Sequence, residues 1–486
     1  MPVSTPNPQH AAWSKAWTLM RHTLSGQRAI HQHAEAQRYL PRLSGESNVN
    51  YDARLARSPW YNATWRSLEG FVGMLFRKEP KVEVSARAEA LLEAVTQDGQ
   101  PFGTFARLTG QEMESMGFCG VLVDHPPMPA GLVVTQARAE EMGLQPSMAL
   151  YPPENIINWR YESINNRRVL SLVVLFELHE VERIGDEFTR DSVKRYRVLD
   201  LSDGGVEDGP RYYRQRLFDE GSNLVDDPVW PTMNGKLMPE IPFELFGDGV
   251  PPLEDLAHMN VSHFQTTSDL EHGAHKTALP QAWVAGLDVQ PGPDGSAAPG
   301  QELTIGGSDA WCLPQGATAG YLEFSGAGLV ALENRAAAKE RYMAVLASRM
   351  LEQQKAGVES AEAAGIHRAG EQSTLQSHAD QLGLGFARCL GWFDQWCGGP
   401  GVATCAINKD FMPTGLTAQE MTAYMQMWQG GAISYEEFFA NMQRGGRITD
   451  ETDIETEKAR IETAPPVLPT PASGATGAGD GSGVTE

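Results

Sequence analysis

The sequence predicts an α+β fold in which helices and an antiparallel sheet occupy different stretches of the chain. Before about residue 116, apolar side chains recur every three or four positions, the period of an amphipathic helix. Between residues 146 and 246, β-branched and aromatic runs are broken by Gly, Asp and Pro, which is typical of antiparallel strands. Two long helical segments then flank a strand-rich stretch.

The N-terminal part is expected to be mostly helical. Its apolar residues lie at helical spacing, and prolines such as Pro41 and Pro80 close the pattern. Arg54 falls outside the apolar stripe and is expected on another face. After the last helix, the run GVLVDHPP predicts a buried strand. The expected helices cover residues 9–40, 51–76, 86–96 and 101–116.

Within the sheet region, Asn165–Asn166 between two strand-like runs predicts a hairpin turn. A long helix is expected from Pro251–Pro252, since proline suits the first turn of a helix. Short strands should follow, and then a helix of high intrinsic propensity over residues 327–353.

The C-terminal third predicts a different order of elements. Residues 354–366 are small and Gly-interrupted, which predicts a mobile loop before a helix at 367–397. The short strand GVATCAIN precedes a helical pair at 417–428 and 434–443, with Ser434 as the candidate N-cap of the second helix. From Ala464 the Pro-, Thr-, Gly- and Ala-rich composition predicts disorder.

Composition sets the broad class. A chain of 486 residues with 41% hydrophobic content predicts several substructures with real cores. It has no apolar run of 18 residues and no secretory leader pattern, so we expect no membrane span and synthesis in a cytoplasm. The five cysteines are scattered, which favours reduced, mostly buried thiols over a disulfide framework or a zinc site.

The formal charge of −23 argues against tight, sequence-specific DNA binding, which usually needs a basic patch. The longest basic runs are pairs such as Arg167–Arg168. An acidic surface would let DNA slide without adhering, because carboxylates repel phosphates. Net charge does not distinguish such a surface from that of an ordinary acidic protein.

Catalytic motifs are absent from the sequence. It has no phosphate-binding loop, no G-x-S-x-G elbow and no H-E-x-x-H pair. His272 and His275, with Asp269 and Glu271 nearby, have a spacing that a metal could use, but a solvated or subunit-facing helix surface is the favoured explanation. We therefore expect no enzyme activity, no cofactor and no metal.

The order of several segments resembles a portal-like family of tailed bacteriophages and prophages, part of which is catalogued as a domain of unknown function. The resemblance covers residues from about 50 to about 445, and no single motif is decisive. The segments are YDARLARSPWYNATWRSLEGFVGMLFRKEP, YPPENIINWRYE, PPLEDLAHMNVSHFQTTSDLEHG, DAWCLPQGATAGYLEFSGAGLVALENRAAAKERYMAVLASRML and HRAGEQSTLQSHADQLG.

The resemblance implies a portal architecture with a fixed order of regions. Tailed-phage portals are rings, usually of twelve subunits, at one capsid vertex. The clip strands would pair between neighbouring subunits. The implied regions are a wing at 1–250, a first stem helix at 251–278, a clip at 279–324, a second stem helix at 325–353, a tunnel loop at 354–366, a helix and strand returning to the wing at 367–414, a crown at 415–446 and a disordered tail at 447–486.

The resemblance also implies roles for individual residues. Residues of the tunnel loop and the following helix would line the DNA channel: Lys355, Val358, Ile366, His367 and Arg368. Charged residues of the second stem helix would contact neighbouring subunits, unless they pair within their own helix: Arg335, Lys339, Arg341 and Arg349. Two tryptophans of the clip would dock the terminase: Trp283 and Trp311.

Such a protein would be a virion component at the portal vertex, made in the cytoplasm of a host bacterium. Its partners would be further copies of itself, double-stranded DNA passing weakly and without sequence preference, the terminase large subunit, a major capsid or scaffold protein, and a head-completion or adaptor protein. The alternatives are another oligomeric phage head-morphogenesis or adaptor protein, or an uncharacterised enzyme.

Overall fold

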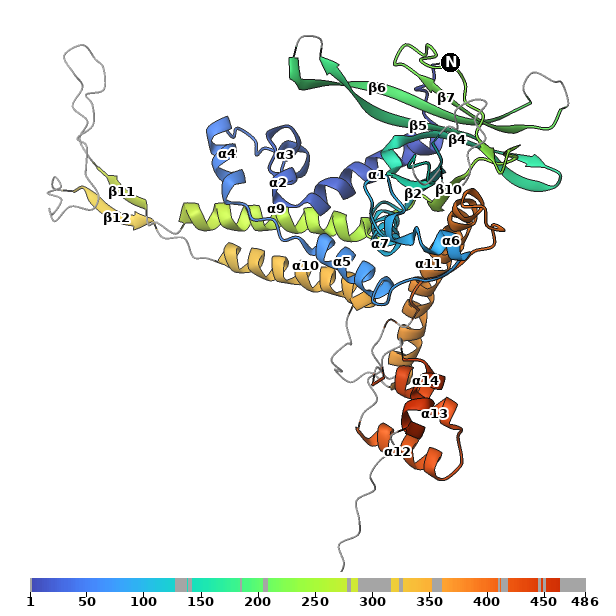
Figure 1. The fold of residues 1–486 in the computed structure, drawn as a ribbon. Coiled ribbons are helices and arrows are strands. Elements are labelled where there is room, and N and C mark those ends of the chain that lie inside the picture. The colour runs from blue at the N-terminus through green and yellow to red at the C-terminus, as the bar shows by residue number, and fades with distance from the viewer. Residues whose placement is uncertain are drawn as a thin grey trace, which may run out of the picture. The chain divides into compact units, whose positions relative to one another are not determined.

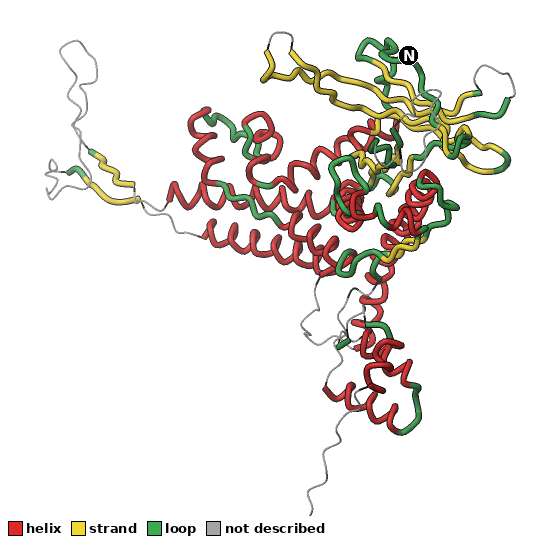
Figure 2. The backbone as a smooth tube through the Cα atoms, viewed as in Figure 1, coloured by secondary structure: helices red, strands yellow, loops and turns green. Residues whose placement is uncertain are grey.

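The computed structural model divides the chain into two compact units, Met1–Lys409 and Asp410–Glu486. Helices and antiparallel sheets occupy separate regions of the first unit (Figure 2), as an α+β fold requires. The structure describes residues 2–126, 138, 142–183, 186–203, 209–277, 281–286, 316–322, 327–351, 361–409, 411, 418–444, 447–448 and 452–463.

The first unit begins with short helices that pack on one another and on α9. Single helical turns follow at Leu92–Ala94 and Pro153–Asn155. The helices are α1 (Pro8–Ser25), α2 (Gln27–Ile30), α3 (His33–Tyr39), α4 (Asn48–Arg57), α5 (Ala63–Leu75), α6 (Ala86–Glu89) and α7 (Phe102–Met116).

Several of the expected N-terminal helices are shorter than periodicity suggested. The prediction of a single helix over residues 9–40 was wrong. Gly26 adopts φ +75° and donates its N–H to carbonyls of the last turn of α1, and this conformation ends α1. The segment 51–76 is broken after Arg57, and Asn62 then caps α5 by accepting from the N–H of Trp65 at 3.2 Å. The helix expected at 86–96 is only α6, whereas α7 confirms the one at 101–116.

Four antiparallel strands form the largest sheet, in the order β4–β5–β6–β7 (Figure 1). Its strands are β4 (Ile156–Ile164), β5 (Arg167–Arg183), β6 (Asp186–Ser202) and β7 (Tyr212–Phe218). The hairpin turn predicted between β4 and β5 is confirmed, because Asn165 and Asn166 have φ of 51° and 61°. Two successive residues with positive φ are the signature of the turn that matches strand twist.

Smaller sheets connect distant parts of the first unit. The three-stranded sheet has the order β10–β2–β3, and two-stranded sheets pair β1 with β13 and β8 with β9. The predicted buried strand is confirmed as β2. The strands are β1 (Lys81–Glu83), β2 (Phe118–Asp124), β3 (Ser147–Tyr151), β8 (Thr232–Met233), β9 (Lys236–Leu237), β10 (Phe243–Gly247) and β13 (Thr404–Ala406).

An aromatic cluster joins the helices to the sheets. Trp13 of α1 stacks on Trp159 of β4 with ring centroids 5.9 Å apart, and Phe118 of β2 lies 5.0 Å from the same ring. Trp17, fully buried, donates its indole N–H to the carbonyl of Met116 at the end of α7. Rings of this size supply much of the burial that fixes α1 to the sheet.

Two long helices, α9 (Glu254–Thr277) and α10 (Ala327–Leu351), lie side by side in the first unit (Figure 1). Both helices predicted for this region are therefore confirmed. The chain between them contains β11 (Gln281–Ala285) and β12 (Thr318–Leu322), which pair antiparallel with each other in the same chain. The facing edges of these two strands are joined within one chain, and pairing of their outer edges between neighbouring subunits stays a prediction.

Helix α11 (Ala361–Trp396) starts earlier than expected. The last residues of the segment 354–366, expected as a loop, are helical from Ala361, and their Ala-rich sequence has high helix propensity. Residues 354–360 of that segment lie outside the described residues.

The second unit consists, in its described part, of α12 (Ala418–Gln429), α13 (Tyr435–Arg444) and α14 (Ile454–Thr463). Ser434 accepts from the N–H of Glu437 at 3.1 Å, which confirms the predicted N-cap. The expectation of disorder from residue 447 was wrong for α14. Asp453 caps this helix, and Lys458 of α14 pairs with Glu436 of α13 at 2.7 Å. Residues after 463 lie outside the described residues.

Two absences hold for the described part of the chain. None of its helices combines the length and the apolar character that crossing a bilayer requires. Its His, Cys, Asp and Glu residues form no group of three that could hold a metal ion.

Candidate functional site

Helices α9 and α10 run antiparallel, and polar contacts join them near the middle of each helix. Gly273, late in α9, lies against Leu329 near the start of α10, whereas His263 contacts Glu340 further along α10. Together with the intervening β-hairpin, this helix pair is the part of the chain for which the portal resemblance implies a stem and a clip.

Lys339 of α10 is held entirely by α9 of the same chain. Its ammonium donates to the carbonyl and the hydroxyl of Ser262 at 2.8 and 2.7 Å, and to the hydroxyl of Thr266 at 2.7 Å. These three acceptors match the three donors of an ammonium group. Burial, together with the nearby charge of Arg335, lowers the pKa of Lys339.

His263 makes the second contact between the two helices. Its side chain is buried, and its Nε2 lies 3.1 Å from the carboxylate of Glu340. The other ring nitrogen, Nδ1, has no hydrogen-bond partner among the described residues. The helix pair is thus held by directed polar contacts that fix its register, in addition to apolar packing around Met343.

On its other side, α9 is fixed to the body of the unit by a buried asparagine. The side-chain oxygen of Asn260 accepts from the N–H groups of Ala63 and Thr64 at 3.1 and 3.3 Å, at the start of α5, where the first N–H groups of a helix have no acceptor within the helix. Its amide donates to the carbonyl of Tyr61 at 2.8 Å. A residue of α9 therefore caps another helix.

A buried ion pair fixes α4 beside α9. Arg54 and Glu46 have side chains only 1% and 5% exposed and form two hydrogen bonds of 2.9 and 2.8 Å. Arg54 also lies near Ser268 of α9, which bonds the hydroxyl of Ser58 at 2.7 Å. Arg54, expected on a polar face, is thus among the largest fully buried side chains.

The face of α10 away from α9 is exposed and partly apolar. Tyr342 and Val330 are 61% and 54% exposed, and Val345 is 46% exposed. The expected contact residues Arg335 and Arg341 are exposed on α10, and Arg341 donates to the carbonyl of Ala337 at 3.3 Å. Lys339 differs from both because it faces α9.

The remaining predicted site residues are only partly described. Trp283 lies on β11 with its side chain exposed. Ile366, His367 and Arg368 lie in α11, where the backbone alone is described, and Arg349 lies likewise in α10. Three residues fall outside the described part of the chain: Trp311, Lys355 and Val358.

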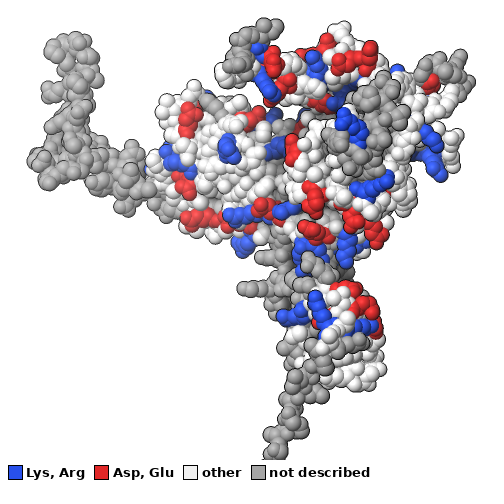
Figure 3. Space-filling view, viewed as in Figure 1, with Lys and Arg blue, Asp and Glu red and all other residues white. Residues whose placement is uncertain are grey.

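Charges of both signs are mixed on the face of the molecule in Figure 3, and neither sign forms a large patch there. Many of the basic side chains in the large sheet are paired with carboxylates. Arg214 and Arg216, for example, both bond Asp200. This mixing fits the sequence-based expectation of weak attraction for phosphate.

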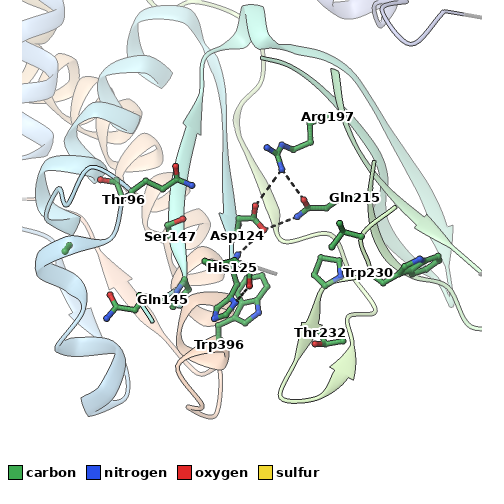
Figure 4. Close-up of a pocket in the computed structure, with 17 residues that line it drawn as sticks. Thr96, Asp124, His125, Gln145, Ser147, Arg197, Gln215, Trp230, Thr232 and Trp396 are labelled. Carbon is green, nitrogen blue, oxygen red and sulfur yellow. Dashed lines mark hydrogen bonds and ion pairs between the residues drawn. The ribbon is translucent and has the colours of Figure 1, made fainter. Parts of the chain in front are cut away.

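A separate cavity of about 780 Å³ opens between the two larger sheets and the end of α11 (Figure 4). Asp124, at the end of β2, lines it beside Gln215 and His125. The lining residues come from the loop after α6, the ends of β2 and β3, strands β6 and β7, the segment before β8, and α11. Those labelled in the figure are Thr96, Asp124, His125, Gln145, Ser147, Arg197, Gln215, Trp230, Thr232 and Trp396.

Arg197 organises the polar side of this cavity. It bonds Glu177 through two nitrogens at 2.6 and 3.2 Å, and it donates to Gln215 at 3.1 Å. Burial would raise the pKa of Glu177, but the bonds from Arg197, His179 and Tyr151 lower it, so this carboxylate stays ionised. No sequence motif pointed to this cavity, because its residues are scattered between positions 94 and 396.

Comparisons with known proteins give weak structural matches and one family match. The virion of a native gene transfer agent (GTA) particle contains a chain 12% identical, with a TM-score of 0.36, covering 82% of this chain and 94% of that one. A chain in the neck of an empty GTA particle computed with C6 symmetry is 12% identical, with a TM-score of 0.36, and the match covers 84% of this chain and 95% of that one. A chain in the neck of a native GTA particle computed with C12 symmetry is 11% identical, with a TM-score of 0.35, and the match covers 80% of this chain and 92% of that one.

No curated protein matches the sequence. Residues 252–397 match a family model described as a domain of unknown function, DUF4055, and this span runs from the start of α9 to the end of α11.

Proposed function

We propose that the chain is a portal subunit of a tailed phage or prophage, forming a ring at one capsid vertex through which the genome is packaged and ejected. The observation that carries this proposal is the α9–α10 hairpin. The two helices have 24 and 25 residues, so each is about 36 Å long at about 1.5 Å per residue. Hairpins of this length, placed side by side around an axis, would form the wall of a tube.

The exposed face of α10 supplies a surface for ring contacts. A ring needs a heterologous contact that closes on itself, with one face of each subunit meeting a different face of the next. Tyr342, Val330 and Val345 on α10 would be covered by the neighbouring subunit, and Arg335, Arg341 and Arg349 would contribute charged contacts. Lys339 would act differently, because it holds α10 against α9 within one subunit.

The proposed channel would pass DNA without gripping it. The chain carries a formal charge of −23, so phosphate would be attracted only weakly and without sequence preference. The channel contacts would come from the segment around Lys355 and Val358 and from Ile366, His367 and Arg368 at the start of α11. In this proposal the chain is a structural protein and not an enzyme.

The strand-rich segment between α9 and α10 would carry the docking surface for the packaging motor. Trp283 is exposed on β11, and it would contact the terminase large subunit together with Trp311. Capsid or scaffold protein and head-completion proteins would bind elsewhere on the ring.

Ring formation tests the proposal directly. Mass photometry and negative-stain images of the purified protein should show closed rings, as a heterologous contact that closes on itself produces, and the portal resemblance implies about ten or more chains in each ring. Introducing charge on α10 by combining Tyr342→Glu with Val345→Glu should abolish rings while leaving the far-UV circular dichroism spectrum unchanged.

A matched control is available on α4. Val49 is 76% exposed, so Val49→Glu adds the same kind of charge outside the proposed interface and should leave rings intact. A wild-type protein that stays monomeric at micromolar concentration across several salt levels would contradict the proposal. Rings that persist in the α10 variant would remove α10 from the interface.

A further inference from the structure

The cavity of Figure 4 has two chemically different sides. On one side are aromatic and proline residues, including His125 stacked on Trp396 with ring centroids 6.1 Å apart. On the other side are uncharged polar side chains, among them Thr96, Gln145 and Ser147. Cavities of roughly 300–1,000 Å³ with an apolar wall and a few polar groups are typical of small-ligand sites.

The charge at the centre of the cavity is unbalanced. Arg197 is bound bidentately by Glu177, so its charge is already compensated by one carboxylate. Asp124 is a second carboxylate, and its closest approach to Arg197 is 3.9 Å, beyond hydrogen-bond distance. With His179, which bonds Glu177 at 2.7 Å, counted as neutral, two carboxylates near one guanidinium leave one negative charge in this group.

Neutral donors hold Asp124 in place without neutralising it. Its Oδ1 accepts from the N–H of His125 at 3.0 Å and from the amide of Gln215 at 2.9 Å. Within the described part of the chain, its Oδ2 has only the long contact with Arg197. Among the described residues, Arg197 and Asp124 are the only Lys, Arg, Asp or Glu side chains that line the cavity.

The neighbouring basic residues of β7 do not face the cavity. Side chains alternate along a strand, and Gln215 lines the cavity, so Arg214 and Arg216 project from the opposite face of β7. Both bond Asp200. The guanidinium of Arg214 lies 5.4 Å from the ring centroid of Trp230, so one indole of the cavity wall already makes a cation–π contact.

We propose that this cavity binds an organic cation, a guanidinium or alkylammonium group, with Asp124 as its counter-ion and the stacked rings of His125 and Trp396 as its apolar wall. A carboxylate supplies charge-assisted hydrogen bonds to such a group, and aromatic faces attract it. The cation can belong to a basic side chain of a protein segment or to a free polyamine. This site is independent of ring formation and of the proposed DNA channel.

Isothermal titration calorimetry on the purified full-length chain tests the site. The probes are acetyl-Gly-Arg-Gly-amide, spermidine and, as an uncharged comparison, acetyl-Gly-Gln-Gly-amide. We expect saturable binding of at least one cationic probe and none of the glutamine peptide. The better cationic probe identifies whether a protein side chain or a polyamine is the ligand.

Two variants connect the binding to the named residues. Asp124→Asn keeps an oxygen that accepts from His125 and Gln215 but removes the charge, so it should weaken cation binding at least about tenfold. Trp396→Leu removes an aromatic face from the cavity wall and should weaken binding about threefold or more. Glu69→Gln, an exposed change on α5, is the matched control and should leave the affinity unchanged.

The result that overturns the proposal does not depend on either variant folding. Absence of saturable binding of both cations to the wild-type chain, or equal affinity for the glutamine peptide, is sufficient. Wild-type affinity in a folded Asp124→Asn protein also rules out the assigned counter-ion.

Discussion

Replacing Asn260 of α9 by alanine should destabilise a different helix, α5. The substitution removes the side-chain acceptor at the buried start of α5: the N–H of Ala63 keeps its bond to the carbonyl of Tyr61 at 2.9 Å, whereas the N–H of Thr64 loses its partner among the described residues. Losing a cap costs about 1 kcal/mol, and leaving a buried donor without a partner costs about 1–3 kcal/mol. The free energy of opening of α5 should therefore fall by about 2–4 kcal/mol. At about 1.4 kcal/mol per factor of ten, the equilibrium constant for opening should rise about 30- to 700-fold.

Hydrogen exchange measured by mass spectrometry checks this value. Peptides covering α5 should exchange faster in Asn260→Ala by that factor, whereas peptides of β5 and β6 should change little. Asn62→Ala is the comparison variant, because Asn62 caps the same helix locally through the N–H of Trp65. It should have a smaller effect, about fivefold for a cap that contributes about 1 kcal/mol, because the acceptor from α9 stays in place. Unchanged exchange of α5 in Asn260→Ala would refute a capping role for α9.

Three further substitutions have expected outcomes in thermal denaturation. Arg54→Ala leaves Glu46 buried without its partner, so it should lower the free energy of unfolding by about 3–5 kcal/mol. The hydrogen bond from Arg54 lowers the pKa of Glu46 to about 2. The wild type should therefore lose this stabilisation as the pH falls from about 4.5 toward 2, whereas the variant should not. His378 bonds Glu114 at 2.8 Å, which raises the pKa of His378, so the wild type should lose stability as the pH rises above about 6.5, and His378→Gln should remove that dependence. Gly249→Ala should destabilise by about 1–3 kcal/mol, because φ is +93° there and the added Cβ would lie 2.4 Å from an indole of α1; an unchanged midpoint would contradict the close approach.

Periodicity predicted the elements that have a strong, uninterrupted pattern. Helices α7, α9 and α10 and strand β2 lie where the sequence placed them, and the Asn165–Asn166 turn was readable from its residue types. The N-terminal helices were predicted too long, because apolar spacing continues through short breaks. A positive φ at Gly26 ends α1, although the apolar spacing alone continues beyond it.

The polar residues that fix α9 could not be identified from the sequence. Arg54 and Asn260 look like surface residues in an amphipathic pattern, yet both are buried. Their burial depends on partners far away in the chain: Asn260 bonds residues 196 to 199 positions away, and Arg54 approaches Ser268 across 214 positions. A local pattern holds no information about contacts of that range.

The cavity around Asp124 was missed for a related reason. Each lining residue is ordinary in its own segment, and the site exists only where several strands and α11 converge. A motif search needs a fixed spacing, which this arrangement lacks. The predicted roles of Trp283 and the α10 arginines, in contrast, came from the portal resemblance and stay predictions.

The pairing of β1 with β13 has a consequence for synthesis of the protein. The hydroxyl of Thr404 bonds Glu83 across 321 positions of sequence, so the first unit closes only after the ribosome has made α9, α10 and α11. Contacts of such separation form late, since the intervening chain must first be brought together. A nascent chain would therefore expose the α9–α10 hairpin before β1 and β13 pair. Where several ribosomes translate one messenger RNA, the exposed hairpins of neighbouring nascent chains would have to be kept apart until β13 has been made.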